Sequence, residues 1–250
     1  MMLNGRRSGF ESRHANRGLW VVVLLAAIAL GCATAPEMPA PRPRAVLLAP
    51  TRFDPRLAQR LEPGAGVVDA LMRRLLWEQD IQVNVPAQEE LRDSWVAAAR
   101  SVAARQGASG ELGVDTYDAT VHALAGALRG RGERFDALLV PYLTIRLGVV
   151  TGHSVSWDGV TRRLPLDYKY RNNPILEVRR QAPCTSLRLI AFDEDGHRLF
   201  ERVGGLEVAS RMRIDEDSLR GTWSDRADLF QDSKALREGV EAALRPLLRN

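Results

Sequence analysis

The chain is poor in cysteine, with only Cys32 and Cys184 among its 250 residues. If Cys32 is acylated, as its surroundings indicate below, Cys184 has no partner for a disulfide within the chain. A scaffold held by disulfides is therefore excluded, even in an oxidising compartment. Because a free cysteine inside a domain behaves as a small hydrophobe, we interpret Cys184 as a buried and inert thiol.

The chain also lacks the motifs of common catalytic and cofactor sites. It has no His-Glu-x-x-His zinc motif, no Gly-x-Ser-x-Gly elbow, no phosphate-binding loop and no Gly-x-Gly-x-x-Gly fingerprint. Histidine is scarce, and after the N-terminal segment only His122, His153 and His197 remain. Residues 193–196 (Asp-Glu-Asp-Gly) begin like a calcium loop, but its ligand pattern does not continue, which favours a hairpin turn. The sequence therefore predicts no enzymatic activity, no cofactor and no metal site.

Lysine is nearly absent, since Lys169 and Lys234 stand beside 33 arginines. The formal net charge of the chain is +4, but residues 1–31 alone, with four arginines and one glutamate, supply +3 of it. The remainder carries 31 basic and 30 acidic residues. Such a balance gives no overall attraction for nucleic acid, and no nucleic-acid partner is predicted.

No apolar run is long enough to span a bilayer, which takes about 20 residues. The longest run begins at Trp20, ends at Gly31, follows several arginines and gives way to small residues. A basic start, a short apolar core and small residues at its end form the pattern of a secretory signal. We therefore predict a signal peptide at residues 1–31.

The end of that run, Ala29-Leu30-Gly31-Cys32, resembles the lipobox of bacterial lipoproteins. It departs from the commonest form, because leucine usually stands three residues before the cysteine and Ala29 stands there instead. The resemblance implies cleavage before Cys32, lipidation of Cys32 and stable anchoring by several acyl chains. In such lipoproteins the residue that follows, here Ala33, implies sorting to the outer membrane, with the chain facing the periplasm.

A tether is predicted after the anchor. Residues 33–44 contain four prolines, which sustain neither a helix nor a central strand, so residues 32–44 are expected to be extended. At ~3.1 Å per residue, such a segment reaches roughly 35–40 Å. No second linker follows, and residues 45–250 are predicted to form a single domain.

Hydrophobic patterning predicts mainly alternating helices and strands in the first half of this domain. Strands are expected at 45–50 and 81–85, a loop around Pro63 and Gly64, and helices at 67–76, 91–102 and 117–128.

Antiparallel strands are predicted to dominate the second half. Strands are expected at 135–150, 161–170, 185–192, 197–203 and 206–214, with turns at 151–159 and 193–196 and a closing helix from Ser233. The predicted fold class is α+β, a mixed sheet with antiparallel hairpins in its second half and helices packed mainly on one side.

Trp157 and Asp158 in a predicted turn, with Arg162 just after it, form the most distinctive cluster of the sequence. In one interpretation the tryptophan covers the edge of the sheet beside the Asp158-Gly159 turn. In the other, the three residues are an exposed contact for a partner, because aromatic residues and arginine dominate binding hot spots.

The order of elements resembles a group of periplasmic lipoprotein domains. This order is similar to that of the curli-secretion lipoprotein and the penicillin-binding-protein activator lipoproteins. It consists of residues 45–50, a helix, residues 81–85, Phe135 to Tyr142, a long hairpin, Ser186 to Asp193 and a closing helix. The resemblance implies a mixed sheet that acts through protein contacts, without known catalytic residues. The expected function is therefore a non-enzymatic, membrane-anchored lipoprotein that binds a periplasmic protein in envelope biogenesis or secretion. The alternatives are a subunit of an oligomeric outer-membrane export assembly and a hydrolase that pairs Cys184 with a histidine.

Replacing Cys32 with serine tests the anchor. The Cys32→Ser variant should move from the membrane fraction to the soluble fraction, because serine offers no thiol for acylation. Cys184→Ser, the matched control, should remain with the membranes. Co-sedimentation of Cys32→Ser with membranes would contradict the anchor.

Overall fold

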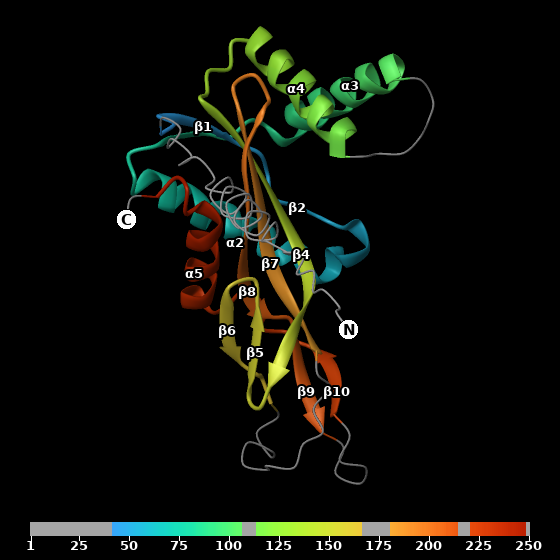
Figure 1. The fold of residues 1–250 in the computed structure, drawn as a ribbon, viewed down its shortest axis with the longest axis vertical. Coiled ribbons are helices and arrows are strands. Elements are labelled where there is room, and N and C mark those ends of the chain that lie inside the picture. The colour runs from blue at the N-terminus through green and yellow to red at the C-terminus, as the bar shows by residue number, and fades with distance from the viewer. Residues whose placement is uncertain (1–41, 107–113, 167–180, 215–220, 249–250) are drawn as a thin grey trace, which may run out of the picture. The chain divides into compact units, whose positions relative to one another are not determined.

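The computed structural model describes residues 42–106, 114–166, 181–214 and 221–248. The predicted signal peptide, Cys32 and residues 33–41 of the tether lie outside these residues, as does the end of the strand expected at 161–170. Residues Arg42–Asn250 group into one compact unit. Its described part contains four α-helices, one short 3-10 helix and two β-sheets (Figure 1).

The first elements form a parallel β-α-β unit. β1 (Ala45–Leu48) leads through β2 (Arg52–Phe53) and the 3-10 helix η1 (Pro55–Leu57) into α2 (Ala58–Trp77). β3 (Gln82–Asn84) then runs parallel to β1. Because α2 returns the chain to the start of the next parallel strand, its end lies at the edge where β1 and β3 begin (Figure 1).

α2 begins earlier than the sequence predicts, because the expected loop around Pro63 and Gly64 is part of the helix. Gly64 is buried, and a Cβ atom at this position would lie 2.5 Å from the ring of Phe230. The ring therefore packs directly on the backbone of α2. This tertiary contact offsets the low helix propensity of the segment.

The centre of the sheet is the pairing of two long strands. β4 (Ala137–Thr151) and β7 (Gln181–Asp193) run antiparallel over thirteen residue pairs, from Ala137 opposite Asp193 to Val149 opposite Gln181. β8 (Arg198–Val208) pairs with the other edge of β7. β1 pairs in parallel with the start of β4, so the sheet is mixed.

The remaining strands form two hairpins. β5 (Ser154–Trp157) and β6 (Val160–Arg163) continue the sheet from the end of β4, whereas β9 (Ser210–Ile214) and β10 (Gly221–Asp225) form a separate two-stranded sheet. The predicted α+β class, a mixed sheet with antiparallel later strands, is confirmed for the described residues, in which the main sheet has eight strands.

Two details of the later strands differ from the prediction. β5 lies inside the segment 151–159, which was expected to be turn, because the turn itself needs only Gly152 and His153, and Gly152 adopts a positive φ of 58°. The single strand expected at 206–214 is interrupted at Ala209, which separates β8 from β9.

The helices cover both faces of the sheet, which corrects the prediction that they pack mainly on one side. α2 and α5 (Ser233–Leu244) pack on one face, and α3 (Gln88–Gln106) and α4 (Val114–Gly130) pack on the other. β1 shows the cause, because its consecutive residues Val46, Leu47 and Leu48 are all buried and alternate between the two faces. In a strand buried on both faces, apolar and polar residues do not alternate, so the sequence does not show which face the helices cover.

Glycine permits the closest packing between α5 and the sheet. A Cβ on Gly204 of β8 would overlap the carbonyl oxygen of Gly239 of α5, and a Cβ on Gly239 would overlap the carbonyl oxygen of Gly205. On the opposite face, a Cβ on Gly205 would meet Val160 and Trp157 of the β5–β6 hairpin. β8 is therefore held closely between a helix and a hairpin.

The replacement Gly239→Ala should destabilise the domain by about 2 kcal/mol, because added bulk in a close-packed contact forces the backbone apart. Gly126→Ala is the matched control, since Gly126 also lies within a helix but has open space at its Cβ position. The control should stabilise the domain by about 0.5–1 kcal/mol through higher helix propensity. Chemical denaturation measures both, and equal effects of the two changes would contradict the close packing.

Candidate functional site

Trp157 and Asp158 of the β5–β6 hairpin make their contacts within the domain. Trp157 is only 7% exposed, and its indole N–H donates to the carbonyl oxygen of Thr185 at 3.1 Å. Asp158 accepts a hydrogen bond from the hydroxyl of Ser186 at 2.6 Å and pairs with Arg146 at 3.0 Å. The tryptophan therefore has the covering role and not that of an exposed contact.

Arg162 connects the same hairpin to α5. Its guanidinium pairs with the carboxylate of Glu238 and donates to the carbonyl oxygen of Ala235 at 3.3 Å. The three residues singled out in the sequence thus hold the β5–β6 hairpin against the strands and helix beneath it. A partner that met this hairpin would find these side chains already engaged.

Cys184 lies in the same part of the core. It is fully buried beside Gly148 and Val155, and its thiol donates to the carbonyl oxygen of Ala182 at 3.3 Å. Burial raises the pKa of the Cys184 thiol to about 12. A thiol that stays protonated is a poor nucleophile, which supports the inert interpretation and not the hydrolase.

The structure places His122 next to His197, which the sequence could not show. Their ring centroids are 5.7 Å apart, where the β7–β8 turn meets α4. A Cβ on Gly196 would overlap the backbone of His122, so the glycine permits this close approach. Nδ1 of His197 lies 3.2 Å from a carboxylate oxygen of Asp193.

An open hollow of about 570 Å³ adjoins the two histidines and is shared with Asp118 and Arg198, which form an ion pair at 2.7 Å. No set of three or more His, Cys, Asp or Glu side chains in the described ranges is placed to hold a metal ion.

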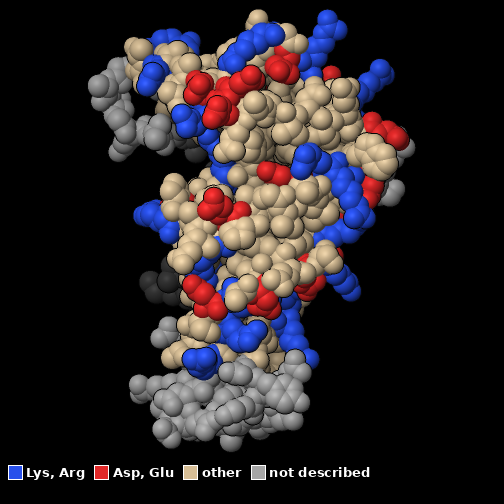
Figure 2. Space-filling model, turned by 180° about the vertical axis from the view of Figure 1, so that it is seen from behind, with Lys and Arg blue, Asp and Glu red and all other residues tan. Residues whose placement is uncertain are grey.

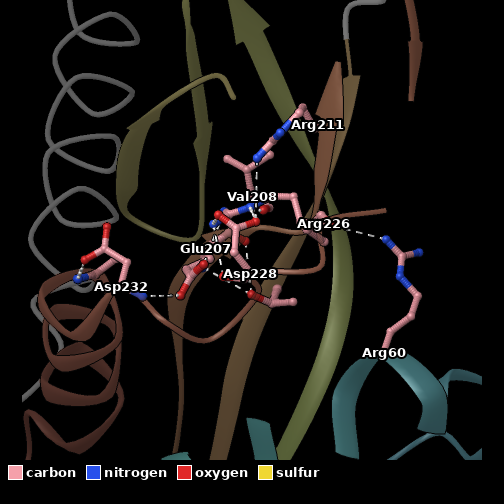
Figure 3. Close-up of polar contacts among 10 residues, drawn as sticks. Arg60, Glu207, Val208, Arg211, Arg226, Asp228 and Asp232 are labelled. Atoms are coloured by element: carbon pink, nitrogen blue, oxygen red, sulfur yellow. Dashed lines mark hydrogen bonds and ion pairs between the residues drawn. The ribbon is translucent and has the colours of Figure 1, made fainter. Parts of the chain in front are cut away.

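Glu207 is a buried carboxylate on β8, only 3% exposed. One of its oxygens accepts a hydrogen bond at 3.1 Å from the backbone N–H of Asp232, the residue that caps α5, and the other lies 3.2 Å from Arg226. Figure 3 shows Glu207 between these two residues. Burial raises the pKa of Glu207 above its ordinary value, and the charge of Arg226 opposes that rise.

Arg226 carries the other half of this buried pair. It donates to the carbonyl oxygen of Val208 at 3.0 Å and to both carboxylate oxygens of Asp228, at 3.0 and 3.1 Å. These hydrogen bonds hold the pKa of Asp228 below its usual range. The pair thus joins β8, the segment after β10 and the start of α5.

The polar cluster extends to α2 through Arg60, which donates to the carbonyl oxygen of Ala209 and pairs with Asp225 at 2.8 Å (Figure 3). Beside it lies a hollow of about 440 Å³, lined by Arg211, Arg213, Ser224, Asp225, Arg226, Ala227 and Asp228. Since acids share the hollow with the arginines, it carries little surplus positive charge. We interpret the cluster as a structural link among four elements.

An exposed apolar pair lies on the far half of β4. The side chains of Leu147 and Val149 are 62% and 58% exposed and point to the same face, since residues two apart in a strand do so. The edge of β4 opposite β7 pairs with β2 at Tyr142 and Leu143 and with β5 from Val149 onward. Between them, from 144 to 148, no described strand pairs with this edge.

The face of the molecule drawn in Figure 2 carries charges of both signs, with Lys and Arg interspersed among Asp and Glu.

No family model matches the chain, and no curated protein matches it at a significant level. Among the described helices, none has both the length and the apolar character that a membrane crossing requires.

The replacement Arg226→Met tests the buried ion pair through its pH dependence. Removal of one partner leaves the Glu207 charge buried alone, which should destabilise the domain by about 3 kcal/mol at pH 7. A carboxyl whose folded pKa is raised stabilises the fold below its unfolded pKa and loses that contribution as the pH rises through the folded pKa. Without Arg226 the pKa of Glu207 should rise further, so the stability difference from the parent protein should shrink between pH 7 and pH 5.

Denaturant titration at several pH values measures this difference. The double variant Arg226→Met with Glu207→Gln is the control, because it has no titrating group at position 207, and its stability difference from the parent protein should not shrink as the pH falls. Parallel pH curves for Arg226→Met and the control would refute the coupling.

Proposed function

We propose that the chain is a bacterial envelope lipoprotein, held at the outer membrane through acylated Cys32, whose α/β domain binds a periplasmic protein without catalysing a reaction. The anchor is supported by the secretory pattern of residues 1–31 and by the small residues before Cys32. Binding is supported by one observation above all, the open edge of β4 beside two exposed apolar side chains. The process served is envelope biogenesis or secretion.

The open edge is suited to backbone recognition. Leu139 accepts a hydrogen bond from the backbone N–H of Ala49 in the chain that follows β1, so its carbonyl faces this edge. Because backbone direction alternates along a strand, Ile145 and Leu147 direct their N–H and C=O groups to the same edge. No strand of the described residues pairs with them, and backbone groups without a strand partner form a template for an added strand.

An extended segment of another protein is therefore the expected occupant. Strand addition takes its affinity from main-chain hydrogen bonds and its specificity from alternate side chains. Here Leu147 and Val149 would meet the apolar side chains of the added segment on one face of the sheet. Their burial would remove exposed apolar area from water, which favours association.

Site-specific photo-crosslinking in intact cells tests this binding. A photoreactive residue at Val149 should give a discrete adduct with a second protein, whereas the same residue at Val67, an exposed valine on α2, should not. Leu147→Thr keeps the backbone N–H and should retain part of the adduct. Leu147→Pro removes the donor at the open edge and should reduce the adduct at least tenfold.

Circular dichroism of each variant confirms that the domain is folded. An undiminished adduct in folded Leu147→Pro would rule out strand addition. An adduct with twice the mass of the chain would instead favour the alternative function, a subunit of an oligomeric export assembly.

A further inference from the structure

We propose that the edge of the domain where the tether enters rests on the lipid surface, with the indole of Trp77 in the headgroup region. This contact rests on the proposed anchor at Cys32 and adds a second, reversible attachment of the domain to the membrane. Its occupant is the phospholipid surface itself, and the residues involved differ from those of the open edge of β4.

Trp77 is the most exposed of the large apolar residues described, at 76%. It is the last residue of α2, and the two residues before it, Leu75 and Leu76, are buried. The indole therefore projects from a part of the helix that is otherwise fixed in the core. Tryptophan combines an apolar body with a polar N–H, and for this reason it is enriched at membrane interfaces.

The chain enters the domain beside this tryptophan. Arg42, the first described residue, donates to the side-chain oxygen of Gln79 at 2.9 Å, and the backbone N–H of Gln82 donates to the carbonyl of Arg44 at 2.9 Å. The first contact is with the turn that follows α2, and the second is with the first residue of β3. Trp77 thus lies two residues from the point where the tether meets the fold.

The length of the tether brings lipid to this edge. Nine residues lie between Cys32 and Arg42, and the ten steps from one to the other reach about 30 Å when extended. A bilayer that holds acylated Cys32 is therefore always within reach of the end of α2. A protein partner would have to come to this edge, whereas the lipid surface is already beside it.

Both signs of charge lie near Trp77, with arginines in excess. Arg42, Arg44 and Arg73 lie on the entering segment or on the last turns of α2. Glu78 is paired with Arg74 and Arg237, and Asp136 accepts a hydrogen bond from the backbone N–H of Arg44. Residues 73 and 77 lie on the same face of the helix, four positions apart. Basic residues beside an interfacial aromatic add attraction for anionic headgroups.

Fluorescence quenching by brominated lipid tests the contact. The full chain, purified from membranes, is reconstituted into vesicles of phosphatidylethanolamine and phosphatidylglycerol in which part of the lipid is brominated near the headgroup end of its acyl chains. We expect this lipid to quench the tryptophan emission, and Trp77→Phe to remove at least half of the quenching. Trp223→Phe, which alters the distant β10, should leave the quenching unchanged.

The comparison separates this proposal from the anchor. Acyl chains on Cys32 or an uncleaved apolar run would each hold the chain in the vesicle, and any emission from Trp20 would be the same in both variants. Equal quenching of the parent protein and Trp77→Phe would overturn the lipid contact alone and leave Trp77 as a contact for protein. A full chain that does not purify with membranes would overturn both proposals.

Discussion

The antiparallel pairing of β4 with β7 is the interaction on which the rest of the described structure depends. All three hydrophobic clusters include residues of this pair of strands: Leu139 and Leu187 on the α2–α5 face, Leu138 on the α3–α4 face, and Cys184 beneath the β5–β6 hairpin. The pair extends the hydrogen-bond ladder well beyond the helices that cover its first half. One end of β4 therefore belongs to the compact α/β core and the other carries the exposed side chains.

Much of this architecture could be predicted from local patterning. The long strand ending near Val150 is visible as alternating apolar residues, and the Asp158-Gly159 turn is visible from its composition, with Asp158 at a φ of 40° and Gly159 at 78°. The start of α2 could not be predicted, because the helix around Gly64 depends on Phe230, far away in the sequence. Likewise, the packing of helices on both faces of the sheet could not be predicted. Strands such as β1 are buried on both faces, so apolar and polar residues do not alternate along them.

The candidate sites were less predictable than the fold, because each depends on residues brought together from distant segments. Nothing in the sequence distinguishes Glu207 or Arg226 from a charged residue at the surface, so their buried ion pair could not be predicted. His122 and His197 lie side by side only because Gly196, which has no Cβ, lets the β7–β8 turn pack directly on the backbone of α4. Trp157 was visible as a distinctive residue, but its role inside the core depends on the carbonyl of Thr185, which no pattern reveals.

We propose that the domain presents two separate surfaces, a lipid-facing edge at the end of α2 and a partner-binding edge on the far half of β4. β4 runs ten steps from Ala137, which lies beside β1, to Leu147. At ~3.3 Å per residue this span is roughly 30 Å. Spin labels at Arg73→Cys and Leu147→Cys, with a nickel chelate attached to the lipid headgroups, measure this directly, since buried Cys184 should remain unlabelled. The account predicts strong relaxation by nickel at position 73 and almost none at position 147. Equal relaxation at both positions, or stronger relaxation at 147, would contradict it.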